Sequence, residues 1–564
     1  MKVSDYIVRY LIIKGVTDVF GYPGGMVTHL IDSLGNNSDK ITNHLTYNEQ
    51  GAAFAACGYA QATGKVGVAY ATSGPGATNL VTGICNAYFD SIPTIFITGQ
   101  VNTFEGKGDL PVRQRGFQET DIVSMTKNVT KFSKTIEDAN LIKWYLDKAF
   151  FEATSGRKGP VLLDIPMDVS RSEVDEHELS SYEIESQIYE NSVDLIKKIN
   201  QAKRPVFLFG NGVKISGCVD LCRQVIEKIG IPVVTSMIAV DVASYSDLMY
   251  GFVGAYGTRT ANFILSKCDL LISIGARLDV RQVGAIREKF ASDAEIIRYD
   301  IDKSEFSYGI HSNDICIQQD ARTILSLIND SGYEKSDDLY IWLDTCACIK
   351  KHLKLFDDEY PNEIINRLSK VIDDNVIITT DVGQNQVWTA QSFKFKANQK
   401  ALFSGGHGAM GYSLPAAIGA TIGSGKNVIS FNGDGGIQMN IQELQVVARE
   451  KLPIKIVIIN NESLGMIRHF QEMYFEGRYY QTLPQTGFTN PKFELLANAY
   501  GLRYKKIENI DDIDEVVLND TYPIVLEVFI KGFTYVKPKL KFGNPNQDQD
   551  PPIDRKLYKY LLDL

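Results

Sequence analysis

Short runs of apolar and β-branched residues alternate with longer amphipathic stretches from one end of this chain to the other. The alternation is typical of parallel β-sheets covered by helices, because consecutive parallel strands need a long crossover connection. The sequence therefore predicts an α/β fold made of doubly wound parallel sheets. The clearest expected strands are Gly67–Ala71, Pro205–Gly210, Leu270–Gly275, Val376–Thr380, Asn427–Phe431 and Ile454–Asn460.

The chain has 564 residues, which at roughly 150 residues per domain corresponds to three to four domains. Seven acidic residues and few large aliphatic ones lie between Glu173 and Glu190, which indicates an exposed linker. A second, weaker boundary is expected around Asp357 to Asn362. The predicted division is an N-terminal domain 1–171, a central domain 190–335, a C-terminal domain 360–540 and a polar, proline-rich tail 541–564 that runs over the surface into a short last helix.

Two segments far apart in the chain are alike. Gly159–Ile165 and Tyr522–Val528 both have the features of a final buried strand with an acidic residue near its end. An internal duplication of the outer thirds explains this likeness, and chance similarity between two proline-led aliphatic strands explains it about equally well.

The composition excludes several classes of protein. Hydrophobic residues make up 44% and charged residues 22%, so disordered, collagen-like and coiled-coil chains are excluded. The 58 basic and 68 acidic residues give a net charge of −10 without a basic cluster, which argues against nucleic acid or an anionic membrane as a partner. The eight cysteines form no CxxC pair, so neither a disulfide framework nor a zinc knuckle is predicted. Because no signal peptide or apolar run of ~20 residues is found, we expect a cytoplasmic protein.

A carboxylate and a carboxamide follow two neighbouring expected strands. Asp434 stands in a Gly-Asp-Gly-Gly turn directly after a strand, and Asn461 follows the next strand. Ligands of open α/β sheets bind at the carboxyl ends of strands, and these side chains supply hard oxygen ligands suited to Mg²⁺. The Gly-Asp-Gly turn alone is more often an ordinary capped turn, whereas the paired spacing favours a metal site.

Two further features lie in the first third of the chain. Glu49 stands just ahead of an expected small-residue helix, Ala52–Thr63, where a carboxylate also serves to pair with the helix dipole. A glycine-rich turn, Thr72–Asn79, follows the strand Gly67–Ala71 and opens another helix. Such turns bring backbone N–H groups close to a ligand, but each feature alone is weak evidence.

Together these motifs resemble the thiamine-diphosphate-dependent enzymes, and among them the acetolactate synthase catalytic subunits, over nearly the whole chain. The resemblance implies pyrimidine-binding, central flavin-binding-like and diphosphate-binding domains, with active sites shared between subunits of a homodimer or homotetramer. The segments that carry it are Gly21–Gly25, Glu49–Phe54, Ser73–Gly83, Asp90–Pro93, Phe117–Thr120, Asp381–Gln384, Gly408–Gly411, Leu414–Gly419, Gly433–Gly435, Asn460–Asn461 and Leu464–Met466.

The resemblance also implies roles for single residues. Glu49 would hydrogen-bond N1′ of the cofactor's aminopyrimidine, and Gln118 and Gly25 would complete the catalytic group. Asp434, Asn461 and the Ser463 carbonyl would bind Mg²⁺. The implied thiamine diphosphate contacts are Tyr22, Pro23, Gly24, Glu49, Pro75, Asn79, Gly383, Gln384, Gly408, Met410, Gly433, Asp434, Gly435, Gly436, Asn461, Gly465 and Met466.

The middle third contains a strand that runs into a glycine turn, a motif too common to identify a ligand. Its further likeness to acetolactate synthases implies FAD with a largely non-redox role. The implied contacts are Arg157, Gly210, Gly212, Arg277, Asp300, Asp302 and Asp320.

Several positions depart from the family pattern around the substrate. Phe470 stands where biosynthetic synthases usually have Trp, Met167 replaces a Lys, Met26 replaces an Ala, and His407 replaces a Leu. The predicted substrate pocket consists of Met26, Phe117, Met167, Arg281 and Phe470.

Three functions follow from these observations. The first is an enzyme that decarboxylates pyruvate and transfers the hydroxyethyl unit to a second 2-oxo acid, as acetolactate synthase does in branched-chain amino acid biosynthesis, with a small regulatory subunit as a further partner. The second is two-carbon transfer to a nucleotide keto-sugar, because the tail resembles that of related enzymes of surface-polysaccharide biosynthesis. The activity of another 2-oxo-acid decarboxylase belongs to the same alternative. The third, a non-catalytic cofactor-binding subunit, is disfavoured by the intact Glu49, Gln118, Asp434 and Asn461.

Overall fold

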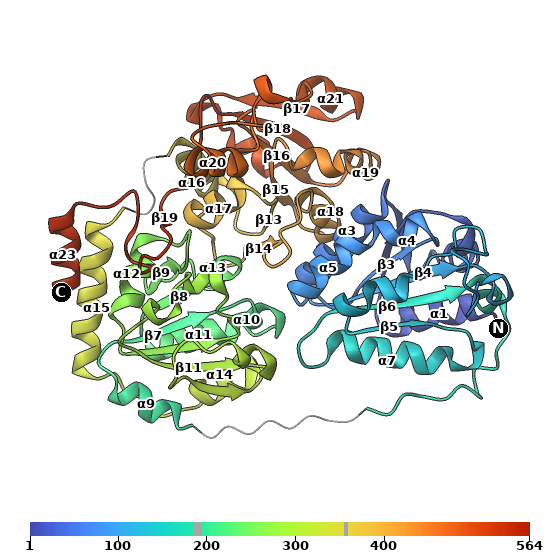
Figure 1. The fold of residues 1–564 in the computed structure, drawn as a ribbon, viewed down its shortest axis with the longest axis horizontal. Helices are drawn as coiled ribbons and strands as arrows, with labels where there is room; N and C mark the ends of the chain where they lie inside the picture. Colours follow the sequence, from blue (N-terminus) through green and yellow to red (C-terminus); the bar gives the residue numbers. More distant parts are fainter. Residues whose placement is uncertain (185–192, 355–358) are drawn as a thin grey trace.

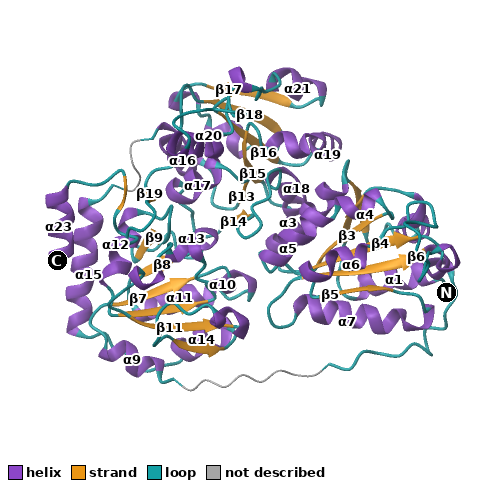
Figure 2. Cartoon of the chain, viewed as in Figure 1, coloured by secondary structure: helices purple, strands orange, loops and turns teal. Residues whose placement is uncertain are grey.

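The computed structural model describes residues 1–184, 193–354 and 359–564, and contains three parallel six-stranded sheets with helices against their faces (Figures 1 and 2). The predicted α/β class with three parallel sheets is confirmed. The predicted linker lies partly outside the described residues, at 185–190, and so does the second boundary, at 357–358. Among the described helices, none combines the length and apolar character required to cross a bilayer.

The first sheet has the strand order β2-β1-β3-β4-β6-β5. Its strands are β1 (Asp18–Gly21), β2 (Thr42–Leu45), β3 (Gly67–Ala71), β4 (Thr94–Gln100), β5 (Phe132–Thr135) and β6 (Pro160–Pro166). Side chains alternate between two cores: Ile95 and Ile97 face the helices α1 (Val3–Ile13), α2 (Thr28–Gly35) and α7 (Ile142–Thr154), whereas Phe96 faces α3 (Glu49–Thr63) and α5 (Val81–Phe89). Helices therefore cover both faces, as the apolar strand runs predicted.

The last sheet repeats this order as β14-β13-β15-β16-β18-β17. Its strands are β13 (Ile377–Thr380), β14 (Lys400–Phe403), β15 (Val428–Gly433), β16 (Ile454–Asn460), β17 (Arg503–Ile507) and β18 (Ile524–Phe529). The helices α16 (Tyr360–Val371) and α17 (Gln384–Ser392) share one core with it, and α18 (Ser413–Ser424), α19 (Leu444–Glu450) and α21 (Phe493–Ala499) share the other. The two similar segments, Gly159–Ile165 and Tyr522–Val528, contribute to β6 and β18. These strands occupy the same place in the two sheets, so the topology agrees with a duplication.

The central sheet has a different order, β12-β11-β10-β7-β8-β9. Its strands are β7 (Pro205–Phe209), β8 (Val233–Thr235), β9 (Met249–Phe252), β10 (Leu270–Ile274), β11 (Glu295–Asp300) and β12 (Ile315–Gln318), and its helices include α11 (Val219–Ile229), α12 (Arg259–Lys267), α13 (Val280–Val283), α14 (Ala321–Asn329) and α15 (Asp337–His352). The chain goes outward from β7 in one direction and from β10 in the other. This is the dinucleotide-binding order, with its switch point between β7 and β10.

The outer domains meet where α3 crosses α18, near the centre of the view in Figure 1. A Cβ atom on Gly58 of α3 would lie 2.1 Å from the carbonyl oxygen of Ala416, and one on Gly419 of α18 would lie 1.8 Å from that of Ala55. Because each helix follows the second strand of its sheet, the two are equivalent elements. Reciprocal glycines therefore allow equivalent helices to approach backbone to backbone.

The structure differs most from the sequence predictions at the start of α3 and in the tail. Helix α3 begins at Glu49 and not at Ala52, because Oδ1 of Asn48 accepts the N–H of Gln50 at 2.8 Å and caps the helix. The tail does end in a short helix, α23 (Arg555–Asp563), but it is not confined to the surface. Two of its polar side chains, Asn546 and Gln549, are buried against the central domain, where their amide groups donate to backbone carbonyls at 2.9 and 2.8 Å.

Candidate active site and dinucleotide cavity

Glu49 lies in the first turn of α3, where the helix dipole favours a negative charge. Its carboxylate is buried, with 7% of the residue exposed, and Oε2 accepts a hydrogen bond of 2.9 Å from Nδ2 of Asn79. Asn79 is the last residue of α4 (Pro75–Asn79), the helix opened by the glycine-rich turn. The two motifs of the first third therefore meet at one carboxylate.

Other predicted residues gather at the same turn. The backbone of Gln118 has a φ of +62°, and a Cβ on Gly74 would lie 2.9 Å from the Cβ of Gln118. On the other side, the N–H of Met26 donates to Oγ1 of Thr72 at 3.2 Å, which anchors the segment that begins with Tyr22. Gln118 and this segment thus flank the turn that leads to Asn79.

Asp434 directly follows β15, and only 3% of it is exposed. Its Oδ2 accepts from Nδ2 of Asn490 at 2.8 Å, and its Oδ1 accepts from the N–H of Gly435 at 2.9 Å. Burial nevertheless raises the pKa of Asp434 to about 6, against the opposing effect of these bonds and of the Ser463 backbone. None of the described residues forms an ion pair with Asp434, and a buried carboxylate of this kind suits a bound cation.

Asn461 follows β16, the neighbour of β15, so it lies at the same sheet edge as Asp434. Its Nδ2 donates to Oγ1 of Thr534 at 2.7 Å and to Oε1 of Gln384 at 3.1 Å. These bonds fix the amide and leave its oxygen as the atom that can bind a ligand. Among the described residues no three His, Cys, Asp or Glu side chains gather as a metal cluster.

Asp381, at the end of β13, holds the segment that contains Gly408 and Met410. Its Oδ1 accepts the backbone N–H of Gly411 at 2.8 Å and that of Tyr412 at 3.1 Å. The side chain is fully buried, and burial raises its pKa to about 7. The predicted contact Gly408 follows a short loop with a φ of +70°, a conformation that favours glycine.

A cavity opens at the switch point of the central sheet. Asn211 and Gly212 line it after β7, and Gly275 lines it after β10. A Cβ on Gly212 would lie 2.7 Å from the Cα of Gly275, and one on Gly210 would lie 2.1 Å from its carbonyl oxygen, so these turns touch backbone to backbone. The glycines at Gly210, Gly212 and Gly275 therefore allow the two turns at the switch point to approach closely.

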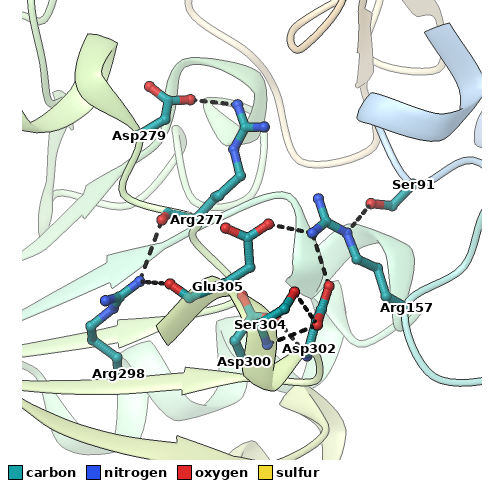
Figure 3. Close-up of polar contacts among 9 residues, drawn as sticks. All are labelled: Ser91, Arg157, Arg277, Asp279, Arg298, Asp300, Asp302, Ser304 and Glu305. Carbon is teal, nitrogen blue, oxygen red and sulfur yellow. Dashed lines mark hydrogen bonds and ion pairs between the residues drawn. The ribbon is translucent and has the colours of Figure 1, made fainter. Parts of the chain in front are cut away.

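Charged groups of both signs line this cavity (Figure 3). Arg157 donates through Nη1 to Asp302 at 3.2 Å and to Glu305, and its Nε donates to Ser91 Oγ at 3.0 Å. Arg277 pairs with Asp279 at 2.7 Å. Both predicted anion-binding arginines thus face the cavity, each in an ion pair with a carboxylate.

Two of the three predicted aspartates, Asp300 and Asp320, line the cavity at adjacent strand ends and differ in environment. Asp300 lines the cavity as the last residue of β11, and burial raises its pKa to about 6. Asp320 lines it after β12 and caps α14, because its Oδ1 accepts the N–H of Arg322 at 2.8 Å. Both residues therefore contribute to the cavity lining at neighbouring strand ends.

The five residues of the predicted substrate pocket lie on separate elements. Met26 is in a short turn before α2, Met167 opens α8 (Met167–Arg171), and Phe117 lies in the loop before α6 (Ile122–Thr126), 79% exposed. Arg281 on α13 lines the cavity, with its guanidinium 5.8 Å from the ring centre of Tyr256. Phe470, on α20 (Gly465–Tyr474), is 47% exposed.

Comparison with known proteins gives a match for each sheet. The N-terminal, central and C-terminal domain models of thiamine pyrophosphate enzymes match residues 1–125, 193–328 and 381–528. The large subunit of acetolactate synthase from Lactococcus lactis is 37% identical over 96% of this chain and 94% of its own length, and that from Corynebacterium glutamicum is 38% identical over 97% and 90%. The isozyme 2 large subunit of Escherichia coli is 35% identical over 97% and 99%. The chain belongs to the acetolactate synthase large-subunit family.

As a member of this family, the protein is a thiamine-diphosphate-dependent enzyme of the carboligase type. Sequence reasoning missed several residues that shape its sites: Asn490 and Thr534 beside Asp434 and Asn461, and Glu305 and Ser91 beside Arg157. Asn490 and Thr534 stand outside any motif, so only the fold reveals them. Asp381 and Ser91, in contrast, lie within segments that carry the family resemblance.

Proposed function

We propose that this enzyme decarboxylates pyruvate and joins the resulting two-carbon unit to a second 2-oxo acid, as an acetolactate synthase. The observation that supports this most strongly is the buried Glu49 carboxylate, oriented by Asn79, in a chain that aligns over nearly its whole length with acetolactate synthase large subunits. Bound thiamine diphosphate supplies the electron sink for the decarboxylation. The protein's own residues have to orient that cofactor and move protons at it.

Glu49 is the proposed proton-handling group. With Oε2 held by Asn79, its other oxygen is available for a charge-assisted hydrogen bond to the cofactor's N1′. Such a bond lets Glu49 hold and return a proton at that nitrogen, which changes the basicity of the neighbouring amino group. Gln118 and Gly25 are proposed to orient the substrate, since Gln118 flanks the turn beside Asn79 and Gly25 belongs to the segment anchored at Thr72.

Asp434, Asn461 and the Ser463 carbonyl are proposed to hold Mg²⁺ against the diphosphate. The fit rests on the donor set, three hard oxygens at one sheet edge, and on the buried Asp434 carboxylate. The other predicted contacts along this edge, from Gly383 to Met466, would place backbone N–H groups around the anion.

FAD is the proposed occupant of the central cavity. The strand order, the backbone-to-backbone glycine turns and the pair Arg157 and Arg277 support a dinucleotide there. On binding, the flavin diphosphate would compete with Asp302, Glu305 and Asp279 for the two guanidinium groups.

We propose a homodimer or homotetramer in which Glu49 of one subunit completes the site at Asp434 of another, and a small regulatory subunit as a further partner. The family resemblance supports both. Subunit sharing is directly testable by complementation, as described in the Discussion.

A different acceptor is the second candidate function. The exposed Phe470 departs from the residue that biosynthetic synthases usually have at this position. Arg281 lies beside Tyr256 at the cavity, at the entrance proposed for the acceptor. Acceptor specificity depends on the contacts that residues of this kind make with the substrate. Colorimetric measurement of acetoin after acid treatment tests both proposals. Acetolactate from pyruvate alone supports the synthase, whereas pyruvate consumption only after addition of a nucleotide keto-sugar supports two-carbon transfer to a sugar.

A further inference from the structure

One buried carboxylate, that of Asp90, lies between the dinucleotide cavity and the loop that carries Gly408 and Met410. Asp90, which follows α5, is 4% exposed. Its Oδ2 accepts the backbone N–H of Gly405 at 2.9 Å, and its Oδ1 accepts that of Gly406 at 2.7 Å. The end of α5 therefore holds this loop two residues before Gly408.

Further contacts from α5 fix the start of the same loop. Ser404 donates through Oγ to Oδ1 of Asn86 at 2.6 Å and accepts the N–H of Ala409 at 3.0 Å. A Cβ on Gly406 would lie 2.8 Å from the Cβ of Phe89, so the loop lies directly against the helix end. The position of residues 404–409 thus depends on α5.

The end of α5 and the start of this loop also line the cavity. Phe89, Asp90, Ser91, Gly405 and Gly406 all contribute to its lining. Ser91 is hydrogen-bonded to Arg157, and the charges of Arg277 and Arg157 act on Asp90. A ligand that engages the two arginines therefore acts next to Asp90.

Resting on the proposed function, in which FAD fills the cavity and the loop contacts thiamine diphosphate, we propose that Asp90 is a positioning residue that couples the two cofactor sites. FAD in the cavity restricts the motion of the end of α5. Through its two hydrogen bonds, Asp90 then restricts the motion of the loop that carries Gly408 and Met410. A flavin that takes no part in electron transfer then has a physical role, because it pre-organises the neighbouring site. Coupling of this kind is reciprocal: each cofactor tightens the binding of the other by the same factor.

Isothermal titration of thiamine diphosphate with the full-length protein, at fixed Mg²⁺ and with or without saturating FAD, tests the proposal. In the wild type FAD should lower the dissociation constant by about fivefold or more, the lower end of typical couplings. Asp90→Asn should bring this factor close to one, because an amide offers one acceptor oxygen to two N–H groups. Asp164→Asn is the matched control: Asp164 is equally buried in the same domain but bonds Thr98, Gln100 and Thr135, and the factor should stay as in the wild type.

Hydrogen exchange provides a second readout, which does not depend on Asp90→Asn. FAD should slow amide exchange in residues 404–412 of the wild type, and Gly406→Ala, which pushes the loop from Phe89, should reduce this protection and the coupling factor. If FAD binds without altering the affinity for thiamine diphosphate, or if Asp90→Asn keeps the wild-type factor, the coupling is refuted while the flavin site stands. If FAD does not bind the wild type, the flavin site and the coupling both fall.

Discussion

Nδ2 of Asn79 donates a hydrogen bond to Oε2 of Glu49 over 2.9 Å, so the last residue of α4 is joined to the first residue of α3, thirty positions earlier in the sequence. The carboxylate is buried and lies in the first turn of α3. One oxygen is therefore held in place by the protein, and the proposed ligand contact falls to the other oxygen.

Replacing Glu49 by Gln should lower turnover by roughly 10²–10⁴-fold, since an amide cannot hold and return the proton. Steady-state rates with pyruvate check this. Glu137→Gln, an exposed substitution in the same domain, should leave the rate unchanged. A Glu49→Gln enzyme with near wild-type turnover would contradict the proton-handling role.

Shared active sites predict complementation between two inactive chains. Glu49→Gln and Asp434→Asn should each be nearly inactive alone, whereas co-expressed chains should regain about a quarter of wild-type activity by random pairing in a dimer. Activity per mole of purified mixed oligomer is the measurement. Sites built within one subunit would show no recovery.

Arg157→Gln should weaken FAD binding by about tenfold or more, because one of the two arginines proposed to meet the flavin diphosphate is lost. Flavin fluorescence quenching gives the dissociation constant. Arg171→Gln, an exposed change outside the cavity, serves as the control. Equal affinities for both variants would show that the diphosphate lies elsewhere.

Phe470→Trp should shift the choice of acceptor. Phe470 projects from α20 beside Tyr474, with ring centres 5.3 Å apart, and a larger ring adds apolar contact for a longer substrate. We expect the preference for 2-oxobutyrate over pyruvate to rise by roughly tenfold, the size of a methylene contact in a pocket. Competition experiments with both acceptors measure it, and an unchanged ratio would remove Phe470 from the acceptor pocket.

Stability should decrease at alkaline pH through His44, which bridges Asp18 at 2.9 Å and Glu450 of α19 at 3.1 Å. Burial alone would lower the pKa of His44, but the bonds to Asp18 and Glu450 raise it to about 9. The contribution of the charged form is thus complete below pH ~6.5 and is lost as the pH rises through about 9. The thermal midpoint of the wild type should exceed that of His44→Asn at pH 6.5, and the difference should shrink by pH 10. A constant difference would argue against a charged His44.

The strands were the most predictable part of the fold. Gly67–Ala71 and Ile454–Asn460 match the expected bounds, because buried parallel strands are short, apolar and followed by polar turns. The start of α3 was placed three residues late, since the apolar pattern begins at Ala52 while the cap at Asn48 sets the true start.

At the sites, the sequence predicts which residues follow neighbouring strands, but it does not predict which residues from distant loops hold them in place. The spacing of Asp434 and Asn461 puts both at one sheet edge because their strands are neighbours. Asn490 and Thr534, which hold these two side chains, come from loops whose path no local pattern determines. The tail differs from its prediction for the same reason: its polar composition indicates exposure, yet the amides of Asn546 and Gln549 satisfy buried backbone groups.

The crossing of α3 and α18 constrains how the two outer domains can evolve. Gly58 and Gly419 leave no room for a single added methyl group on either helix, so neither half of the crossing can change alone without displacing the other. Outer domains with the same strand order must then evolve as a matched pair. A chimera that takes one of them from a distant relative should assemble only when the opposing helix comes from that same relative.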